Sequence, residues 1–183
     1  AEVAFLRAEA TAVYGFSMKG TAADFYEQGV RLSFEQWGAT GVDSYLADES
    51  SVPALYKDPA GLNTYEKNLS NITIKWNEGA SKEEKQERII TQKWIANFPL
   101  SCEAWAEYRR TGYPKLFPNR VNLSNGDINT NEQVRRLIYS DTEINTNNAE
   151  LQKGIEAVNQ ENTGSISGDK GGTHVWWDKS WCR

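Results

Sequence analysis

Residues 21–37, with the sequence TAADFYEQGVRLSFEQW, carry the pattern that decides the fold. Apolar side chains recur here after three or four residues and form one stripe, at Ala23, Tyr26, Val30, Phe34 and Trp37. Such spacing places side chains on one face of an α-helix. The stretch therefore predicts an amphipathic helix whose striped face, including Trp37, packs in a core.

A second helix is predicted just before this one, from Ala1 to about Gly15. It carries a narrow stripe of small side chains, at Ala1, Ala4, Ala8 and Ala12. Small side chains allow the backbone of a neighbouring helix to approach closely. Because Gly20 marks a short connection, residues 1–37 are predicted to form an antiparallel helical hairpin, as in bundles and helical repeats.

Residues 38–80 lose this regularity. Glycines and prolines interrupt the segment and predict mostly loop with brief helices. Order returns at residues 81–84, Ser-Lys-Glu-Glu, which have the form of a capping box and predict a helix that Pro99 ends. The stripe of this helix consists of Ile90, Trp94 and Phe98.

One more helix is predicted from Ser101, as its N-cap, to Gly112. The chain after Tyr113 is rich in turn residues, with a candidate short strand at 134–139, VRRLIY, and a helix around 148–158. The predicted fold class is mainly α, with a helical hairpin, further helices, long irregular loops and little β-structure. The predicted divisions are the hairpin 1–37, a loop-rich region 38–80, and helices with an extended C-terminal segment over 81–183.

Length and charge restrict the classes of function. The chain has 183 residues, 39% hydrophobic and 25% charged, which is typical of one folded domain. No stretch approaches the roughly 18 apolar residues of a membrane span. The net charge of −5, with basic residues interspersed among acids, argues against a nucleic-acid partner.

Cys102 and Cys182 are the only cysteines. Two cysteines so far apart make neither a CxxC redox motif nor a cysteine-based zinc cluster. Cys102 is expected on the apolar flank of its helix, where a buried free thiol is the common state. A disulfide between Cys102 and Cys182 stays open as the less favoured alternative.

Two glutamates in the stretch EAWAEYRRTGYPKLFP, residues 103–118, raise the question of acid–base chemistry. Glu103 and Glu107 lie one helical turn apart, with Arg110 on the same face. A retaining glycosidase uses two carboxylates, but they flank the scissile bond from opposite sides, whereas positions i and i+4 point the same way. We therefore expect a solvated face with one intrahelical ion pair and no catalytic residue.

Other polar residues give no clear site either. Arg109 and Arg110 diverge by about 100° around a helix, which makes a joint anion clamp awkward. His174 is the only histidine and is expected to be a loop residue without a role. The segments that begin at Asp127 and Asp141 space oxygen side chains as calcium loops do, but they lack the required glycine and glutamate. Neither a metal nor a cofactor is expected.

Aromatic residues are numerous, with seven Trp, eight Tyr and six Phe. Rings on helical stripes are expected in the core, namely Tyr26, Phe34, Trp37, Trp94 and Trp105. Trp76, in ITIKWNEG, and Tyr65 lie in the irregular region among asparagines. An exposed ring can stack on a sugar while amides and hydroxyls bind its OH groups. Trp76 and Tyr65 are therefore the candidate glycan-binding residues.

Five stretches, in order along the chain, resemble the C-terminal part of the SusD/RagB family of surface glycan-binding lipoproteins. They are FLRAEA (5–10), ITQKWIANFP (90–99), EAWAEYRRTGYPKLFP (103–118), RRLIYSDTEINTN (135–147) and VWWDK (175–179). Together they span nearly the whole chain, so chance agreement is a poor explanation.

The resemblance implies a mainly helical fold built on tetratricopeptide-type pairs, with residues 1–37 as the last pair. It implies that the chain is a fragment, and that a missing N-terminal portion carries the lipid anchor to the outer membrane. It also implies a partner, a TonB-dependent transporter of the SusC type, and a role in capturing oligosaccharide without catalysis. Sugar contacts vary among members of the family, so Trp76 and Tyr65 rest on the composition argument alone.

Two alternatives remain open at this point. The first is a glycoside hydrolase that uses Glu103 or another acid. The second is a helical-repeat scaffold that binds peptides or proteins and has no role in sugar binding.

Overall fold

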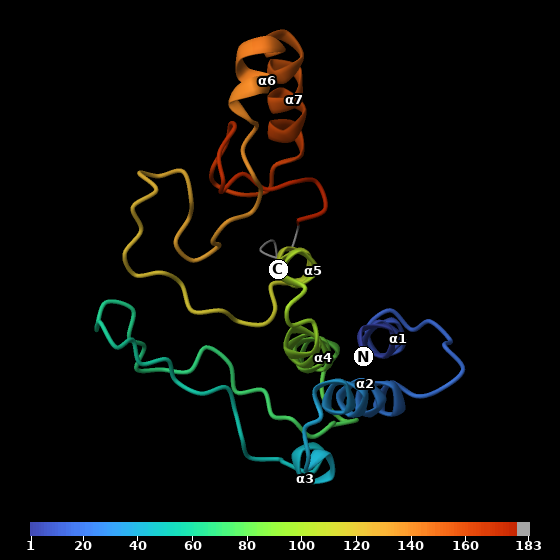
Figure 1. Ribbon diagram of the computed structural model, residues 1–183. Helices are drawn as coiled ribbons and strands as arrows, with labels where there is room; N and C mark the ends of the chain where they lie inside the picture. Colours follow the sequence, from blue (N-terminus) through green and yellow to red (C-terminus); the bar gives the residue numbers. More distant parts are fainter. Residues whose placement is uncertain (179–183) are drawn as a thin grey trace. The chain divides into compact units, whose positions relative to one another are not determined.

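The computed structural model describes residues 1–178, and its regular elements are helices (Figure 1). They are α1 (Glu2–Ala12), α2 (Ala22–Trp37), α3 (Val42–Leu46), α4 (Lys82–Ala96), α5 (Ser101–Thr111), α6 (Asp141–Thr146) and α7 (Asn148–Glu161). The predicted mainly α fold is confirmed. No helix in this range is long and apolar enough to cross a membrane.

The chain divides into two compact units, which are described separately. The first unit consists of residues 1–55, 67–108 and 113–115, and the second of 56–66, 109–112 and the residues from 116 onward. Helix α5 therefore contributes residues to both units.

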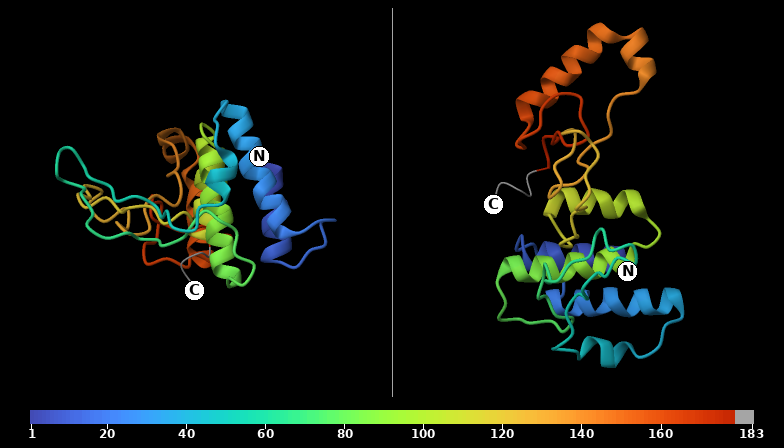
Figure 2. Two further views of the ribbon diagram at one scale, coloured as in Figure 1. Left: turned by 90° about the horizontal axis from the view of Figure 1, so that it is seen from below. Right: turned by 90° about the vertical axis from the view of Figure 1, so that its left-hand side faces the viewer.

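The predicted hairpin is present, although α1 ends three residues earlier than expected, at Ala12. Helices α1 and α2 lie side by side and run antiparallel, joined by residues 13–21 (Figure 2). The Phe5 ring lies 6.2 Å from the Tyr26 ring, centroid to centroid. It also fills the space beside Gly29, where a Cβ atom would lie only 2.7 Å from the Phe5 ring. Close packing of α1 on α2 thus depends on a glycine, and the tetratricopeptide-type classification of this pair stays a prediction.

Both long helices of the first unit that follow a loop begin with a capping box. The Thr21 side chain accepts from the Asp24 backbone N–H, and the Asp24 carboxylate accepts from the Thr21 backbone. Ser81 and Glu84 do the same at the start of α4, as predicted. These contacts satisfy backbone N–H groups that have no partner within the helix.

Helix α4 packs against both α1 and α2, and the three helices, viewed nearly end-on, form a triangle (Figure 1). Ile89 and Ile90 of α4 are buried in their shared core, together with Phe5, Tyr26 and Val30. The hydrophobic core of the first unit lies between these three helices.

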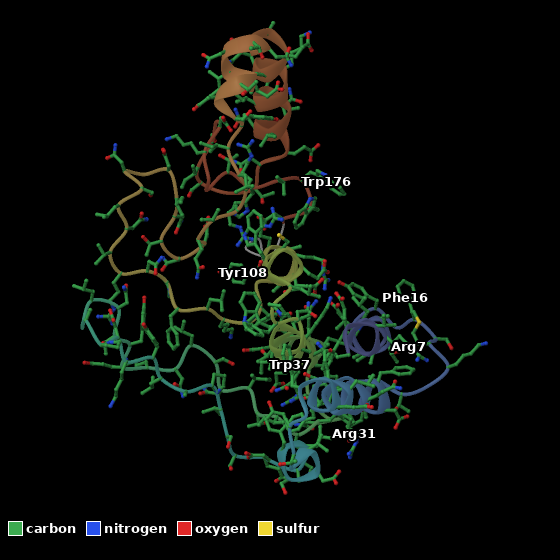
Figure 3. All side chains as sticks on the ribbon, in the orientation of Figure 1. Arg7, Phe16, Arg31, Trp37, Tyr108 and Trp176 are labelled. Carbon is green, nitrogen blue, oxygen red and sulfur yellow. The ribbon has the colours of Figure 1, made fainter. Side chains whose placement is uncertain are left out.

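Trp37, which was expected in the core, is exposed, and so is Phe98, which continues the stripe of α4. Trp37 is 52% exposed and Phe98 is 69% exposed, with their ring centroids 5.8 Å apart. Trp37 is the last residue of α2 (Figure 3) and Phe98 follows the end of α4. Helical spacing gives the direction in which a side chain points, but it does not tell how far the neighbouring helix extends.

In the second unit α6 packs on α7. Helix α7 includes the helix predicted around residues 148–158. The candidate strand at 134–139 is wrong, because this segment has no regular structure. The backbone N–H groups of Arg135 and Arg136 both donate to the carbonyl of Gly171, so the bonds do not form a ladder. The region of Asp141, compared above with a calcium loop, is instead helix α6.

Candidate functional site

Trp76 lies in the irregular segment before α4, with its ring against the core of the first unit. Its centroid is 5.3 Å from that of Tyr26 on α2, and it is half-buried. The Tyr26 hydroxyl donates to the carbonyl of Ile74, which fastens the same segment to α2. Burial raises the pKa of Tyr26, so the hydroxyl stays protonated and keeps donating.

The edge of the Trp76 indole is fixed by polar partners. Its Nε1–H donates to Glu78 Oε2 at 2.6 Å, and Glu78 also pairs with Lys85 Nζ at 3.1 Å. The hydrogen bond from Trp76, followed by that from Lys85, lowers the pKa of Glu78. The carboxylate therefore stays ionised near neutral pH and holds the indole in one orientation.

A mainly polar pocket of about 390 Å³ opens beside Trp76. Its other lining residues are Glu49, Thr73, Lys75, Asn77 and Glu78. Glu49 and Lys75 form an ion pair at its wall. The arrangement combines one aromatic side chain with hydroxyl, amide, ammonium and carboxylate groups, which suits a ligand with many hydroxyl groups. The sequence argument proposed Trp76 as a candidate, which stays a prediction, and did not name Glu49, since no local pattern links Glu49 to a segment so much later in the chain.

Tyr65, the other candidate, belongs to the second unit. Its ring lies 4.7 Å from the ring of Phe117, and the Arg120 guanidinium is 4.7 Å from the Tyr65 centroid. The Tyr65 hydroxyl donates to the carbonyl of Pro118. Phe117 also contacts Tyr56, the more exposed ring of this cluster. Tyr65 thus uses its hydroxyl and part of its ring surface within the unit, and its role in sugar binding stays a prediction.

The paired glutamates of α5 converge on Lys93 of α4, which is almost fully buried. Lys93 Nζ lies 3.3 Å from Glu107, 3.9 Å from Glu103 and 3.4 Å from Glu2. The expectation of a solvated face is wrong for Glu107, which is buried because Lys93 attracts it inward. These carboxylates compensate a buried ammonium and do not face each other across a gap, so they lack the geometry of a glycosidase pair.

His174 lies in a loop of the second unit, as expected. The expectation that it has no role is wrong. The imidazole is buried, with Nε2 3.2 Å from Glu132 and Nδ1 3.2 Å from the carbonyl of Asp178. Arg135 forms a fully buried ion pair with the Asp178 carboxylate. His174 therefore belongs to a buried polar network that holds loops together.

The remaining candidates have structural contacts. Asp127 pairs with Lys170 at 3.2 Å, and within residues 1–178 no three acidic, histidine or cysteine side chains gather as a metal site would need. Arg109 donates to the carbonyl of Arg135 at 2.8 Å. Cys102 is exposed, not on a buried flank, and Cys182 lies outside the described residues. The disulfide question is therefore untested.

Comparisons with known proteins agree on one family. A family model described as SusD-like, SusD and RagB outer membrane lipoprotein, matches residues 1–178. No match is found among curated proteins.

Several solved structures are similar over 97% of the chain. A SusD homologue from Bacteroides uniformis is 72% identical, with a TM-score of 0.87. A SusD homologue from Bacteroides thetaiotaomicron is 48% identical, with a TM-score of 0.89. A SusD homologue from Flavobacterium johnsoniae, described as chitin-binding, is 44% identical, with a TM-score of 0.85.

The chain spans only 36%, 37% and 35%, respectively, of the length of these three structures. The match to the family model nevertheless covers nearly all of the chain, in agreement with the five sequence stretches described above. The chain therefore belongs to the SusD-like family of outer-membrane lipoproteins.

Proposed function

We propose that the protein binds oligosaccharide at the cell surface without cleaving it and passes it to a TonB-dependent transporter of the SusC type. The observation that carries this proposal is the 44% identity, over 97% of the chain, to a SusD homologue described as chitin-binding. The family description as outer-membrane lipoproteins supports a lipid-anchored location in the outer membrane.

The geometry of the first unit supports binding over catalysis. The glutamates that a hydrolase would need, Glu103 and Glu107, share the buried ammonium of Lys93. The pocket beside Trp76 offers an aromatic side chain and several hydrogen-bonding groups. Tyr65 and Tyr56 form the proposed second contact region, within the second unit.

The test is a titration of the protein, at the full length in which the cell makes it, with a panel of oligosaccharides that includes chito-oligosaccharides. Isothermal calorimetry reports the affinity, and a reducing-end assay on the same samples reports cleavage. We expect binding to at least one oligosaccharide and no release of reducing ends. Cleavage would establish the glycoside hydrolase alternative, and the absence of binding to every oligosaccharide would favour the scaffold alternative.

Trp76→Ala tests the proposed pocket within this experiment. Loss of an aromatic contact is expected to weaken binding roughly tenfold or more, about 1.4 kcal/mol. Trp176→Ala is the matched control, since Trp176 is an exposed ring in the second unit that projects from the C-terminal segment (Figure 3). Equal affinities for Trp76→Ala and wild type would remove Trp76 from the site and leave the family function intact.

A further inference from the structure

Four side chains of the second contact region touch one another in the order Tyr56, Phe117, Tyr65 and Arg120. The ring centroids of Tyr56 and Phe117 lie 6.4 Å apart, and those of Phe117 and Tyr65 lie 4.7 Å apart. The Arg120 guanidinium carbon lies 4.7 Å from the Tyr65 centroid. Phe117 and Tyr65 are half-buried, whereas Tyr56 and Arg120 are exposed. The side chains at the two ends of this row therefore offer most of its surface to a ligand.

The loop of residues 56–66, which supplies two of these rings, is held by its own hydrogen bonds. The Asp58 carboxylate accepts from the backbone N–H groups of Ala60 and Asn63, at 3.0 and 2.8 Å. The Asp58 carbonyl accepts from the N–H of Gly61 at 2.9 Å. The bonds from Ala60 and Asn63 lower the pKa of Asp58, so the carboxylate stays ionised near neutral pH. The loop is thus preorganised, which reduces the entropy that ligand binding would cost.

The same loop is joined to the segment that carries Arg120. The Tyr65 hydroxyl donates to the carbonyl of Pro118, and the Arg120 backbone N–H donates to Asn63 Oδ1 at 2.9 Å. The Tyr65 ring then supports the guanidinium itself. Both the backbone and the side chain of Arg120 are therefore positioned by the loop.

The donors of Arg120 are unused within the unit. Among residues 1–178 its guanidinium makes no hydrogen bond and no ion pair, and its one contact of this kind is with the Tyr65 ring. A guanidinium that stacks on a ring keeps its N–H groups in its own plane, directed away from that ring. Two of these N–H groups are spaced to reach two neighbouring oxygen acceptors at once.

We propose that Arg120 binds the oligosaccharide by donating from two guanidinium nitrogens to neighbouring hydroxyl groups of one sugar unit. The exposed Tyr56 ring stacks on another unit of the same ligand, as aromatic side chains do on sugars. Tyr65 and Phe117 are positioning residues, which hold these two contacts at a fixed separation. This inference rests on the proposed function and names the polar contact of its second contact region.

The experiment titrates the protein, at its natural length, with the oligosaccharide panel, including chitohexaose, cellohexaose and xylohexaose. The variants are measured with the member that binds wild type most tightly. Arg120→Ala should weaken binding roughly tenfold or more, and Arg120→Lys, which keeps the charge but not the planar group, should recover only part of the affinity. Each variant is also made with Trp76→Ala, so that binding at the Trp76 pocket does not mask a loss here.

Tyr65→Leu tests the positioning role. It removes the ring that supports Arg120 and should weaken binding about threefold to tenfold. The double variant Arg120→Ala/Tyr65→Leu should nevertheless bind no more weakly than Arg120→Ala, because Tyr65 acts through Arg120. An equal loss from Tyr65→Leu with and without Arg120 would refute this role.

Arg31→Ala is the matched control, because Arg31 is an exposed arginine of the first unit that pairs with Asp43 (Figure 3) and should bind as wild type does. If Arg120→Ala keeps the affinity of its parent, both with Trp76 and with Trp76→Ala, the inference is overturned and the proposed function stands. If wild type binds no oligosaccharide of the panel, both are removed.

Discussion

The helical first unit has a mainly apolar core, although it also buries charged side chains such as Lys93 and Glu107, whereas the second unit buries mainly polar and charged side chains. The core between α1, α2 and α4 contains Phe5, Tyr26, Val30, Ile89 and Ile90. Burial of such side chains is favourable for each one separately, at roughly 25 cal/mol per Å² of apolar surface.

The second unit contrasts with this. Its buried set is dominated by Arg135, Arg136, Thr173, His174 and Asp178. Leu151 on α7 is its one buried large apolar side chain within the described residues. Buried charges are tolerated only when paired and hydrogen-bonded, so the contacts of this unit depend on one another.

Because of this difference, the two units should respond differently to a single substitution. An apolar core loses the energy of the deleted contact and of any cavity, and the loss grows with the volume removed. A polar network loses more, because removal of one partner leaves another buried charge without compensation.

The largest expected effect is that of Asp178→Asn in the second unit. It removes the counter-charge of Arg135, and both side chains are fully buried, so the free energy of unfolding should fall by about 3 to 5 kcal/mol. Urea denaturation followed by circular dichroism measures this. The double variant Arg135→Met/Asp178→Leu should be much less affected, because no charge then remains unpaired.

Lys153→Met provides the control for that experiment. Lys153 and Glu150 form an exposed pair on α7, and loss of such a pair should cost at most about 0.5 kcal/mol. A cost below about 1 kcal/mol for Asp178→Asn would show that the network is not what stabilises the second unit.

The next effect is that of Gly29→Ala in the first unit. The new Cβ would meet the Phe5 ring at 2.7 Å, which should cost about 1 to 3 kcal/mol, reduced by the higher helix propensity of alanine. Phe5→Leu in the same chain should recover part of this loss, as thermal unfolding will show. Gln28→Ala, at an exposed neighbouring position, is the control. A destabilised double variant with no recovery would refute the tight α1–α2 contact.

The smallest effect concerns the capping box at the start of α4. Ser81→Ala removes the acceptor for the Glu84 backbone N–H and should cost about 1 kcal/mol. Thr21→Ala at the start of α2 should cost a similar amount, measured by the same urea denaturation. Indistinguishable stability of both variants and wild type would show that tertiary packing alone sets these helix starts.

The capping box also predicts a dependence on pH. The hydrogen bond from the Ser81 backbone lowers the pKa of Glu84. The Glu84 carboxylate therefore contributes its full stabilisation above the pKa that glutamate has in the unfolded chain, roughly 4.3. This contribution is lost as the pH falls through the lower pKa of Glu84 in the folded state. Glu84→Gln should remove this part of the acid dependence in melting curves between about pH 5 and pH 2.

Much of the first unit could be predicted because its signals are local. The stripe at residues 21–37, the small residues of α1 and the capping box at Ser81 each lie within a few turns of helix. The ends of α2 and α4 could not be judged in the same way. Trp37 and Phe98 continue a stripe but are exposed, since exposure depends on the length of neighbouring elements.

The candidate site divides similarly. Trp76 was proposed as a candidate from its irregular, asparagine-rich surroundings, but Glu49 lines the same pocket from a distant segment. The hydrogen bonds from Arg88 to Thr73 were also not predictable, because they join α4 to a segment without regular structure. His174 and Glu107 were read as solvated or unused, and both are buried with charged partners.

The sequence by itself determined the longer helices and the hairpin of residues 1–37, because spacing and capping act between residues close in the chain. Five stretches of similar sequence also indicated membership of the SusD-like family. Only the tertiary structure decided which charges are buried and paired, and which residues share a pocket with Trp76. The physical reason is that burial and ion pairing join residues far apart in the chain. Neither the spacing of apolar residues nor the composition indicates which of these distant residues come together.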